Sequence, residues 1–203
     1  MRILADNIGK KFNKEWIFRK LSFDIPSKDH MVLTGPNGSG KSTLLKIISS
    51  ITEPSEGFVL FNNNTTELDI GVVSFAAPYQ NLIEELTLSE HLHFHFTFKK
   101  PSLELKEIAD RAGLTTAWDK PVADFSSGMK QRLKLALAMY TQSDLLLLDE
   151  PTANMDQTGI DWYRNEINEI INTKTIIIAS NQRYEYDFLS NVLNISEFSY
   201  SRK

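Results

Sequence analysis

A run of eight residues has the composition and spacing of a loop that binds phosphate groups. It fits the pattern G-x-x-x-x-G-K-S/T and consists of Gly35, Pro36, Asn37, Gly38, Ser39, Gly40, Lys41 and Ser42. Glycines allow several backbone N–H groups to approach one anion, which side chains at these positions would prevent. Lys41 is then placed to reach the β- and γ-phosphates of a nucleotide, and Ser42 to ligate Mg²⁺. The alternative is an ordinary glycine-rich turn, which the flanking strand and helix patterns disfavour.

Two adjacent carboxylates are the second group that could do chemistry. Asp149 and Glu150 follow the apolar run 145–148, and ligands of open α/β sheets collect at the carboxyl ends of such strands. Asp149 is placed to hold Mg²⁺ opposite Ser42, directly or through water, and Glu150 to polarise an attacking water as a general base. The alternative is a polar strand end before a turn at Pro151, which carries little weight beside a phosphate loop.

Short apolar runs and helical segments would position these groups. Residues 30–34 predict a buried strand before the loop, and residues 43–48 a helix whose positive N-terminal end faces the anion. Residues 145–148 and 175–179 are apolar runs typical of buried parallel strands. A helix predicted over residues 157–172 joins these two strands into a βαβ unit. The pattern therefore predicts an α/β core.

The remaining strands and turns are predicted mainly in the first third of the chain. Strands are expected at residues 2–4, 21–25, 58–61 and 70–75. Turns are expected after Ile25 and at residues 62–64.

Residues 78–134 have a helical pattern instead. Thr87 and Glu90 have the spacing of a capping box and open a helix that runs to about Phe98. A second helix is predicted over residues 103–112. A helical stretch inserted between strands of an α/β core predicts a subdomain.

Small residues near the end of this stretch precede another helix. Ser126, Ser127 and Gly128 come directly before apolar residues at helical spacing. Such a helix N-terminus can receive an anion. Taken alone, the segment predicts only a well-capped helix.

The composition excludes several classes of protein. The 203 residues suit one domain with an inserted subdomain, and the net charge of −4 gives no general attraction to nucleic acid. Cysteine is absent, which excludes disulfides and thiolate metal sites. The N-terminus lacks the apolar run of a signal peptide, and no stretch approaches the roughly 18 apolar residues of a membrane span. Any membrane role is therefore expected to come through a partner.

Together, these segments resemble an ABC-type ATPase subunit across nearly the whole chain. In order, that family has an aromatic residue that stacks on adenine, a Walker A phosphate loop, a Gln loop, an L-S-G-G-Q signature, a Walker B Asp-Glu pair, a D-loop and a switch His. Phe12 lies at the usual distance before Gly35 and would stack on adenine; a core aromatic at a strand end is the alternative. The phosphate loop and Thr43 would hold ATP.

Two more motifs carry the resemblance. Residues 125–129 correspond to the signature, with Ser127 in place of the first Gly and Met129 in place of Gln. Residues 153–156 resemble the D-loop, which would place Asp156 at a subunit interface.

The chain departs from the family at two positions. Pro78 stands where the Gln loop expects its glutamine, and Gln80, two positions later, is the candidate ligand for Mg²⁺ or water. Asn181 stands in place of the switch His. Its amide can hydrogen-bond a γ-phosphate or the attacking water, but it cannot hold a positive charge. Hydrolysis is then either slow or adequately supported by Asn181.

Three histidines raise the question of a metal site. His91 and His95 share one face of the predicted helix, and His93 lies between them. Interleaved apolar residues and the lack of a carboxylate-rich motif nearby favour helix-surface or partner-facing roles instead. Trp118 and Trp162 are expected to pack rather than to bind a ligand.

The resemblance implies a composite site in a head-to-tail dimer, either a homodimer or a pair with a paralogue. Ser126, Ser127 and Gly128 of one subunit would touch the γ-phosphate held by the other. The implied function is that of the ATP-hydrolysing subunit of a transporter, with ATP and Mg²⁺ as cofactors. It would act on a separate transmembrane permease from the cytoplasmic face of the cell membrane. The alternative is an ATP-dependent dimerisation switch without transport, which Asn181 favours.

The implied fold is a P-loop ABC ATPase core with a mostly parallel sheet and N-terminal antiparallel strands. The chain would form one such domain over residues 1–203. Within it, residues 1–77 and 135–203 would form the nucleotide-binding core, and residues 78–134 the helical subdomain that carries the signature.

Overall fold

The architecture was analysed in a computed structural model that describes residues 1–62, 66, 68 and 71–199. The strands are β1 (Ile3–Phe12), β2 (Glu15–Ile25), β3 (His30–Thr34), β4 (Glu56–Phe61), β5 (Val73–Ala76), β6 (Leu145–Asp149), β7 (Thr175–Ala179) and β8 (Val192–Asn194). The α-helices are α1 (Lys41–Ile48), α2 (Leu88–Phe98), α3 (Leu105–Arg111), α4 (Ser127–Met139) and α5 (Gln157–Ile170). The 3₁₀ turns are η1 (Thr115–Ala117), η2 (Val122–Asp124), η3 (Arg183–Glu185) and η4 (Ile195–Phe198).

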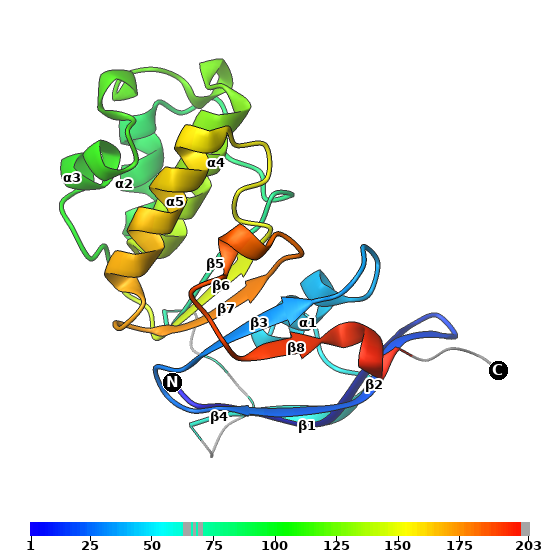
Figure 1. Ribbon diagram of the computed structural model, residues 1–203. Helices are drawn as coiled ribbons and strands as arrows, with labels where there is room; N and C mark the ends of the chain where they lie inside the picture. The colour runs from blue at the N-terminus through cyan, green and yellow to red at the C-terminus, as the bar shows by residue number, and fades with distance from the viewer. Residues whose placement is uncertain (63–65, 67, 69–70, 200–203) are drawn as a thin grey trace.

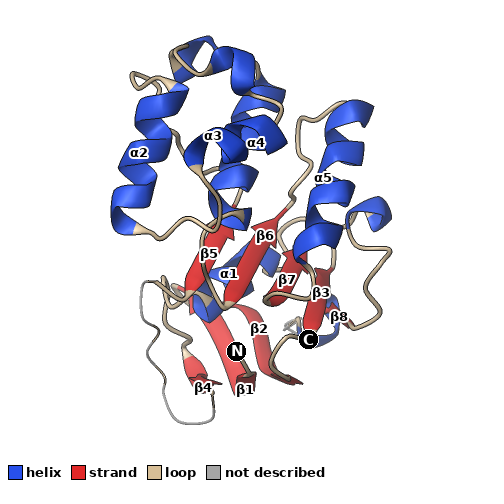
Figure 2. Cartoon of the chain, turned by 90° about the vertical axis from the view of Figure 1, so that its left-hand side faces the viewer, coloured by secondary structure: helices blue, strands red, loops and turns tan. Residues whose placement is uncertain are grey.

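The strands form two sheets that lie in separate layers. Five strands pair in the order β5-β6-β7-β3-β8, and the pairs are parallel. Three strands form an antiparallel sheet in the order β2-β1-β4. Figures 1 and 2 show the antiparallel layer on one side of the parallel sheet and α2 to α5 on the other. The predicted α/β class, with a parallel sheet and N-terminal antiparallel strands, is confirmed.

The apolar run of β6 shows how the parallel sheet is buried on both faces. Side chains of a strand alternate between the faces of its sheet. Leu145 and Leu147 pack in a cluster with α1 and the antiparallel strands, whereas Leu146 and Leu148 pack in a cluster with α4 and α5. Both faces therefore select apolar residues, which explains the continuous run in the sequence.

Helix α4 connects this sheet to the helical part of the molecule. Leu135 packs in the cluster on the sheet, while Leu133 and Leu137 pack in a third cluster with α2 and α3. One helix thus contributes to both cores and crosses the boundary at residue 134. The division into a core and a helical subdomain at residues 78 and 134 stays a prediction.

Several predicted elements differ from the observed ones in length. The strands expected at residues 2–4 and 21–25 overlap the longer β1, which begins at Ile3, and β2, and register shifts interrupt the apolar alternation of both. The helix expected at residues 103–112 begins only at Leu105, and the one expected to reach residue 172 ends at Ile170. A strand was predicted over residues 70–75, and the observed strand β5 begins at Val73. Ile70, and residues 63–64 of a predicted turn, lie outside the described residues.

The capping box at the start of α2 is confirmed. The Glu90 N–H donates to Thr87 Oγ1 at 3.2 Å, and the Thr87 N–H donates to Glu90 Oε2 at 2.8 Å. The two bonds satisfy donors that a helix N-terminus leaves free.

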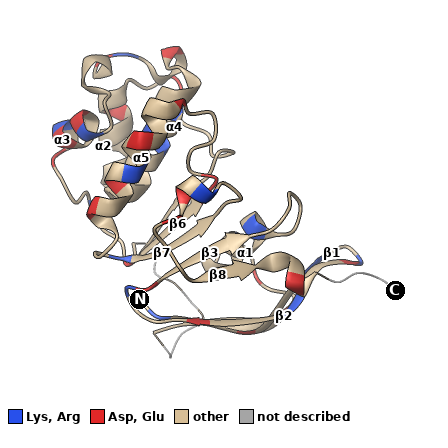
Figure 3. Ribbon diagram, in the orientation of Figure 1, with Lys and Arg blue, Asp and Glu red and all other residues tan. Residues whose placement is uncertain are grey.

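The helices of the described residues can be compared with the requirements of a membrane span. None of its helices combines the length and the apolar composition that a membrane span requires. Figure 3 shows basic and acidic positions interspersed along the chain, in keeping with the modest net charge of −4.

Candidate nucleotide-binding site

The phosphate loop connects β3 to α1 and depends on a glycine at its last turn. Gly40 has φ +104°, and a Cβ atom there would lie 2.6 Å from Ile17 Cγ2. Only glycine adopts this conformation without strain or collision. The Leu44 N–H donates to Gly40 O at 2.8 Å, so α1 starts directly from the loop.

Lys41 is held inside the loop that precedes it. Its side chain is buried, and Nζ donates to Gly35 O at 2.7 Å and to Pro36 O at 3.4 Å. A buried ammonium group needs such acceptors or an anion. The loop thus keeps a positive charge beside its own backbone N–H groups.

A pocket of about 240 Å³ opens at this loop. Its lining combines the phosphate loop with two residues from elsewhere in the chain, and it consists of Asn37, Gly38, Gly40, Lys41, Ser42, Thr43, Glu150 and Ile17. Sequence analysis predicted all of these except Ile17, whose apolar side chain on β2 lacks any distinguishing motif. The structure therefore brings Walker A together with the second carboxylate of Walker B.

Asp149 at the end of β6 has the environment of a cation ligand. It is only 2% exposed, and its Oδ2 atom has no hydrogen-bond partner in the described structure. Burial raises the pKa of its carboxyl, whereas the Ser42 hydroxyl and the nearby Lys41 lower it. A buried carboxylate oxygen without a partner is costly unless a cation compensates it. With Ser42 beside it, this donor set fits Mg²⁺.

Glu150, the next residue, turns out of the sheet in a strained conformation. Its φ is +44°, a left-handed value that is uncommon outside glycine. Its N–H donates to Ala179 O at 2.9 Å, which ties it to β7. The side chain is exposed and lines the pocket, where a general base must lie.

Asn181 reaches the phosphate loop from the end of β7. Its Oδ1 atom accepts a hydrogen bond from the Gly35 N–H at 3.2 Å. The position of the missing switch His is therefore in contact with Walker A.

Gln80 makes a local hydrogen bond, and its role as a ligand of Mg²⁺ or water stays a prediction. Gln80 Oε1 accepts from the Ala77 N–H at 3.0 Å and closes a local turn. Tyr79 interacts with Asp149: burial, followed by the charge and hydrogen bonding of Asp149, raises the pKa of Tyr79 to about 12. Lys46 Nζ lies 4.5 Å from the centre of the Tyr79 ring. Sequence analysis missed Tyr79, because no motif separates it from its neighbours.

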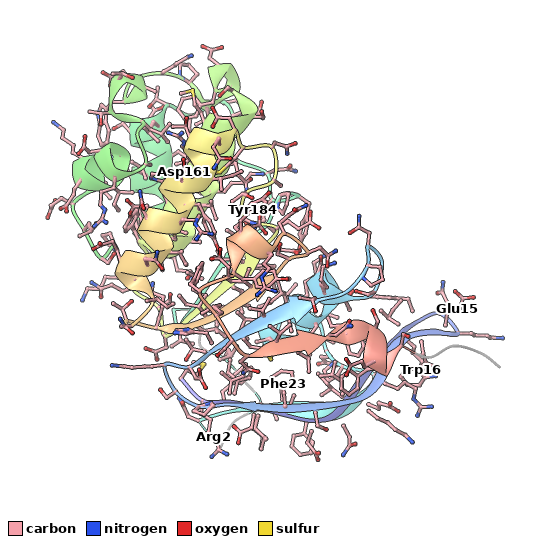
Figure 4. The ribbon with its side chains drawn as sticks, in the orientation of Figure 1. Arg2, Glu15, Trp16, Phe23, Asp161 and Tyr184 are labelled. Carbon is pink, nitrogen blue, oxygen red and sulfur yellow. The ribbon has the colours of Figure 1, made fainter. Side chains whose placement is uncertain are left out.

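Phe12 lies at the exposed end of the β1–β2 hairpin. It pairs with Glu15 and is 51% exposed, and Figure 4 labels Glu15 and Trp16 at this end of the molecule. The alternative of a buried core aromatic is therefore wrong. Stacking on adenine stays a prediction, because Phe12 does not line the phosphate-loop pocket.

The signature and D-loop residues cap helices instead of lining this pocket. Ser126 caps α4, where its Oγ accepts from the Met129 N–H at 3.2 Å; Ser127 and Gly128 form the first turn of that helix. Asp156 caps α5, where Oδ1 accepts from the Gly159 N–H at 2.8 Å. Their contacts with nucleotide or with another subunit stay predictions.

The histidines of α2 make separate hydrogen bonds. His91 is buried, and its Nε2 accepts from the Ile83 N–H at 3.2 Å. His95 Nε2 lies 3.1 Å from Thr141 Oγ1, whereas His93 is exposed. The helix-surface expectation is thus wrong for His91. Within the described residues, no group of three or more His, Asp or Glu side chains is arranged to hold a metal ion.

Comparison with known sequences identifies the family. The model of the ABC transporter family matches residues 18–153, more than half of the chain. An uncharacterised ABC transporter ATP-binding protein of Bacillus subtilis is 35% identical over 171 residues, covering 81% of this chain and 56% of that protein. A lantibiotic transport ATP-binding protein of Streptococcus pyogenes is 30% identical over 197 residues, covering 92% of this chain and 83% of that protein. A second Bacillus subtilis relative is covered over 66% of its length, so this chain spans only part of some relatives.

Solved structures agree on the fold. A putative ABC transporter ATP-binding protein from Pyrococcus furiosus superposes with a TM-score of 0.86 at 21% identity, covering 98% of this chain and all of that one. A bacterial ABC transporter cassette solved as a dimer superposes with a TM-score of 0.83 at 24% identity, covering 95% of this chain and 93% of that one. The family match over residues 18–153, which include the phosphate loop, establishes that the chain belongs to the ABC transporter family.

Proposed function

We propose that this chain binds ATP with Mg²⁺, hydrolyses it in a closed dimer and thereby powers transport through a separate membrane subunit. The observation that carries the proposal is the buried Oδ2 atom of Asp149, which has no partner in the described structure and lies in the same site as Ser42 and Lys41. Such an atom calls for a bound cation. The chemistry that Mg²⁺ supplies when bound is neutralisation and fixing of the β- and γ-phosphates.

The residues of the site divide the reaction between them. Lys41 and the N–H groups of the loop hold the β- and γ-phosphates. Glu150 accepts a proton from water as the water oxygen attacks the γ-phosphorus. The bond from that phosphorus to the β–γ bridging oxygen breaks, and ADP and phosphate leave. Asn181 orients the γ-phosphate or the water through its amide group.

The dimer would complete the site. Residues 126–128 at the start of α4 would contact the γ-phosphate held by a second subunit, with Asp156 at the interface. The dimeric cassette among the structural neighbours supports this arrangement. Because the γ-phosphate provides contacts that ADP lacks, ATP would close the dimer and hydrolysis would open it.

The names of the relatives support a role in transport, and the chain would act at the inner face of the cell membrane. Two relatives are named as a lantibiotic transport protein and a cytochrome c biogenesis export protein. Docking to the membrane subunit would use the helical part and residues 78–86.

A dimerisation switch without transport is the second candidate. Asn181 favours it, because a neutral amide cannot stabilise developing negative charge as a protonated imidazole does. In this case ATP would close the dimer with little turnover.

Phosphate release at steady state tests the chemistry. We expect Glu150→Gln to lower kcat by about 100-fold or more, the usual contribution of a general base. The control is Glu169→Gln, an exposed carboxylate on α5, which should leave kcat unchanged. Equal turnover in Glu150→Gln and the wild type would overturn the assignment of the base. A wild type that closes on ATP but never turns over supports the switch.

Purification from native membranes then tests the transport role. A tagged Glu150→Gln chain is solubilised in detergent with ATP and Mg²⁺, and its bound proteins are identified. Recovery of a polytopic membrane protein supports the transporter. Recovery of soluble partners alone, or of a bare dimer, favours the switch.

A further inference from the structure

The turn that leaves β6 contains two residues in strained backbone conformations. Glu150 has φ +44° and Asn154 has φ +63°. Left-handed conformations of this kind cost energy outside glycine and persist only where surrounding contacts enforce them. The turn also carries the proposed base at one end and leads to Asp156 at the other. Whatever holds it therefore controls the direction of the Glu150 side chain.

Glu185 contacts the centre of this turn. It belongs to η3, four residues after Asn181, and is only 1% exposed. Glu185 Oε1 accepts a hydrogen bond from the Thr152 N–H at 2.8 Å and a second, short one from the Thr152 hydroxyl. One buried oxygen thus accepts both polar hydrogens of the residue midway between the two strained positions.

The segment that carries Glu185 is itself fixed to the core. The buried Tyr163 of α5 donates its hydroxyl hydrogen to Glu185 O at 2.9 Å, and Arg164 donates to Tyr184 O. Figure 4 shows Tyr184 between α5, where Asp161 is labelled, and the parallel sheet. These contacts give Glu185 a rigid support.

A second contact holds the turn from the helical side. Gln131 of α4, the helix that begins with the signature residues, donates from Nε2 to Pro151 O at 2.8 Å. The turn is therefore held between α4 and η3. Of these two described contacts with the turn, only the one from Glu185 is made by a carboxylate.

The environment of Glu185 is costly for a residue that only packs. Its Oε2 atom is buried and has no partner in the described structure. Burial raises the pKa of its carboxyl, although the Ser180 hydroxyl and Thr152 lower it. An apolar side chain of similar size would avoid this cost. What such a side chain could not provide is an acceptor for both hydrogens of Thr152.

We propose that Glu185 is a positioning residue for hydrolysis, which holds Thr152 so that Glu150 faces the nucleotide and the D-loop keeps its course to Asp156. The inference rests on the proposed function. Glu185 acts through Thr152 and does not touch the reacting atoms. Losing it should therefore affect the chemical step more than ATP binding.

Four variants separate positioning from folding. In Glu185→Ala we expect kcat to fall about 100-fold, the scale of a displacement of about 1 Å in an active site, with KM for ATP within about threefold. Glu185→Gln keeps the accepting oxygen and should retain kcat within about fivefold. Thr152→Val loses only the hydroxyl, and its kcat should fall about tenfold. The double variant Thr152→Val with Glu185→Ala should have a kcat no lower than that of Glu185→Ala alone.

The matched control is Glu166→Gln. Glu166 is also a buried carboxylate, bonded to Tyr140 and Arg111 and away from the turn. We expect its kcat to stay within about twofold of the wild type at a temperature where circular dichroism shows both variants folded. An equal loss of kcat in Glu166→Gln and Glu185→Ala would overturn the proposal in favour of general destabilisation. So would a folded Glu185→Ala with normal kcat, or additive losses in the double variant.

Amide hydrogen exchange provides a readout that does not depend on turnover. Residues 152–156 should exchange faster in Glu185→Ala than in the wild type, whereas Glu166→Gln should leave them unchanged. If Glu185→Ala does not fold, Thr152→Val and Glu185→Gln decide the question. If Glu150→Gln abolishes turnover but Glu185→Ala does not, the inference about Glu185 is contradicted while the proposed hydrolysis stands. A wild type without turnover contradicts the proposed hydrolysis, while exchange still tests whether Glu185 holds the turn.

Discussion

Asn181 Oδ1 accepts a hydrogen bond from the Gly35 N–H at 3.2 Å, which joins the end of β7 to the first residue of the phosphate loop. The two residues are 146 positions apart. Adjacent pairing of β3 and β7 brings them together, because parallel neighbours end at the same edge of the sheet. The residue in place of the switch His is thus in direct contact with the loop that is to hold the phosphates.

Asn181→Asp tests this contact by adding charge without changing size. The carboxylate still accepts from the Gly35 N–H, but it places a negative charge where a phosphate must bind. We expect ATP affinity to fall about tenfold, or about 1.4 kcal/mol, as measured by calorimetric titration. Asn191→Asp, the same change beside β3, is the control. An unchanged affinity for ATP in Asn181→Asp would show that Asn181 does not lie close to the bound phosphates.

Gly40→Ala should destabilise the protein more than Gly38→Ala. Both glycines have positive φ, but only at Gly40 would a Cβ atom collide with its surroundings, at 2.6 Å from Ile17 Cγ2 and 2.9 Å from Phe18 Cδ1. We expect Gly40→Ala to lower the free energy of unfolding by about 3 kcal/mol and Gly38→Ala by about 1 kcal/mol. Urea denaturation measures both. Equal losses would show that the loop has room to shift at Gly40.

Asp149→Asn should remove the effect of Mg²⁺ on ATP binding while stabilising the fold. The amide no longer attracts the cation, so ATP affinities with Mg²⁺ and with EDTA should become equal. Relief of the buried, unpartnered carboxylate oxygen should raise the free energy of unfolding by about 1 kcal/mol. Asp119→Asn, an exposed change after η1, is the control for both measurements. If Mg²⁺ still changes the ATP affinity of Asp149→Asn, then Asp149 is not the ligand of the metal.

His95 should make the protein less stable in mild acid. Burial, followed by the charges of His91 and Lys99, lowers the pKa of His95 from 6.5 to about 4. Between these values the unfolded chain binds a proton that the folded chain does not, so stability falls as pH falls through this window. Relative to His95→Gln, we expect the wild type to lose about 1.5 kcal/mol between pH 7 and pH 5 once solvent screening is allowed for. Parallel pH curves in urea denaturation would contradict this.

Local patterns in the sequence determined the phosphate loop, the two carboxylates after β6 and the capping box of α2. Each depends on residues within a few positions of one another, whose backbone requirements can be stated without knowing the rest of the fold. The buried strands β6 and β7 were predictable for a related reason, because burial on both faces of a parallel sheet leaves a continuous apolar run. The full lengths of β1 and β2 were not, since register shifts and exposed polar positions obscure the alternation.

The tertiary structure decided which distant side chains share the site. It turned Gln80 to the Ala77 N–H, brought Tyr79 toward Asp149, and joined Glu185 to Thr152. None of these contacts has a sequence signature, because each depends on how separate segments leave neighbouring strands and helices. Residue types and spacing determined what chemistry the loop and carboxylates can do. Packing of the sheet against α4, α5 and η3 decided which groups contact them.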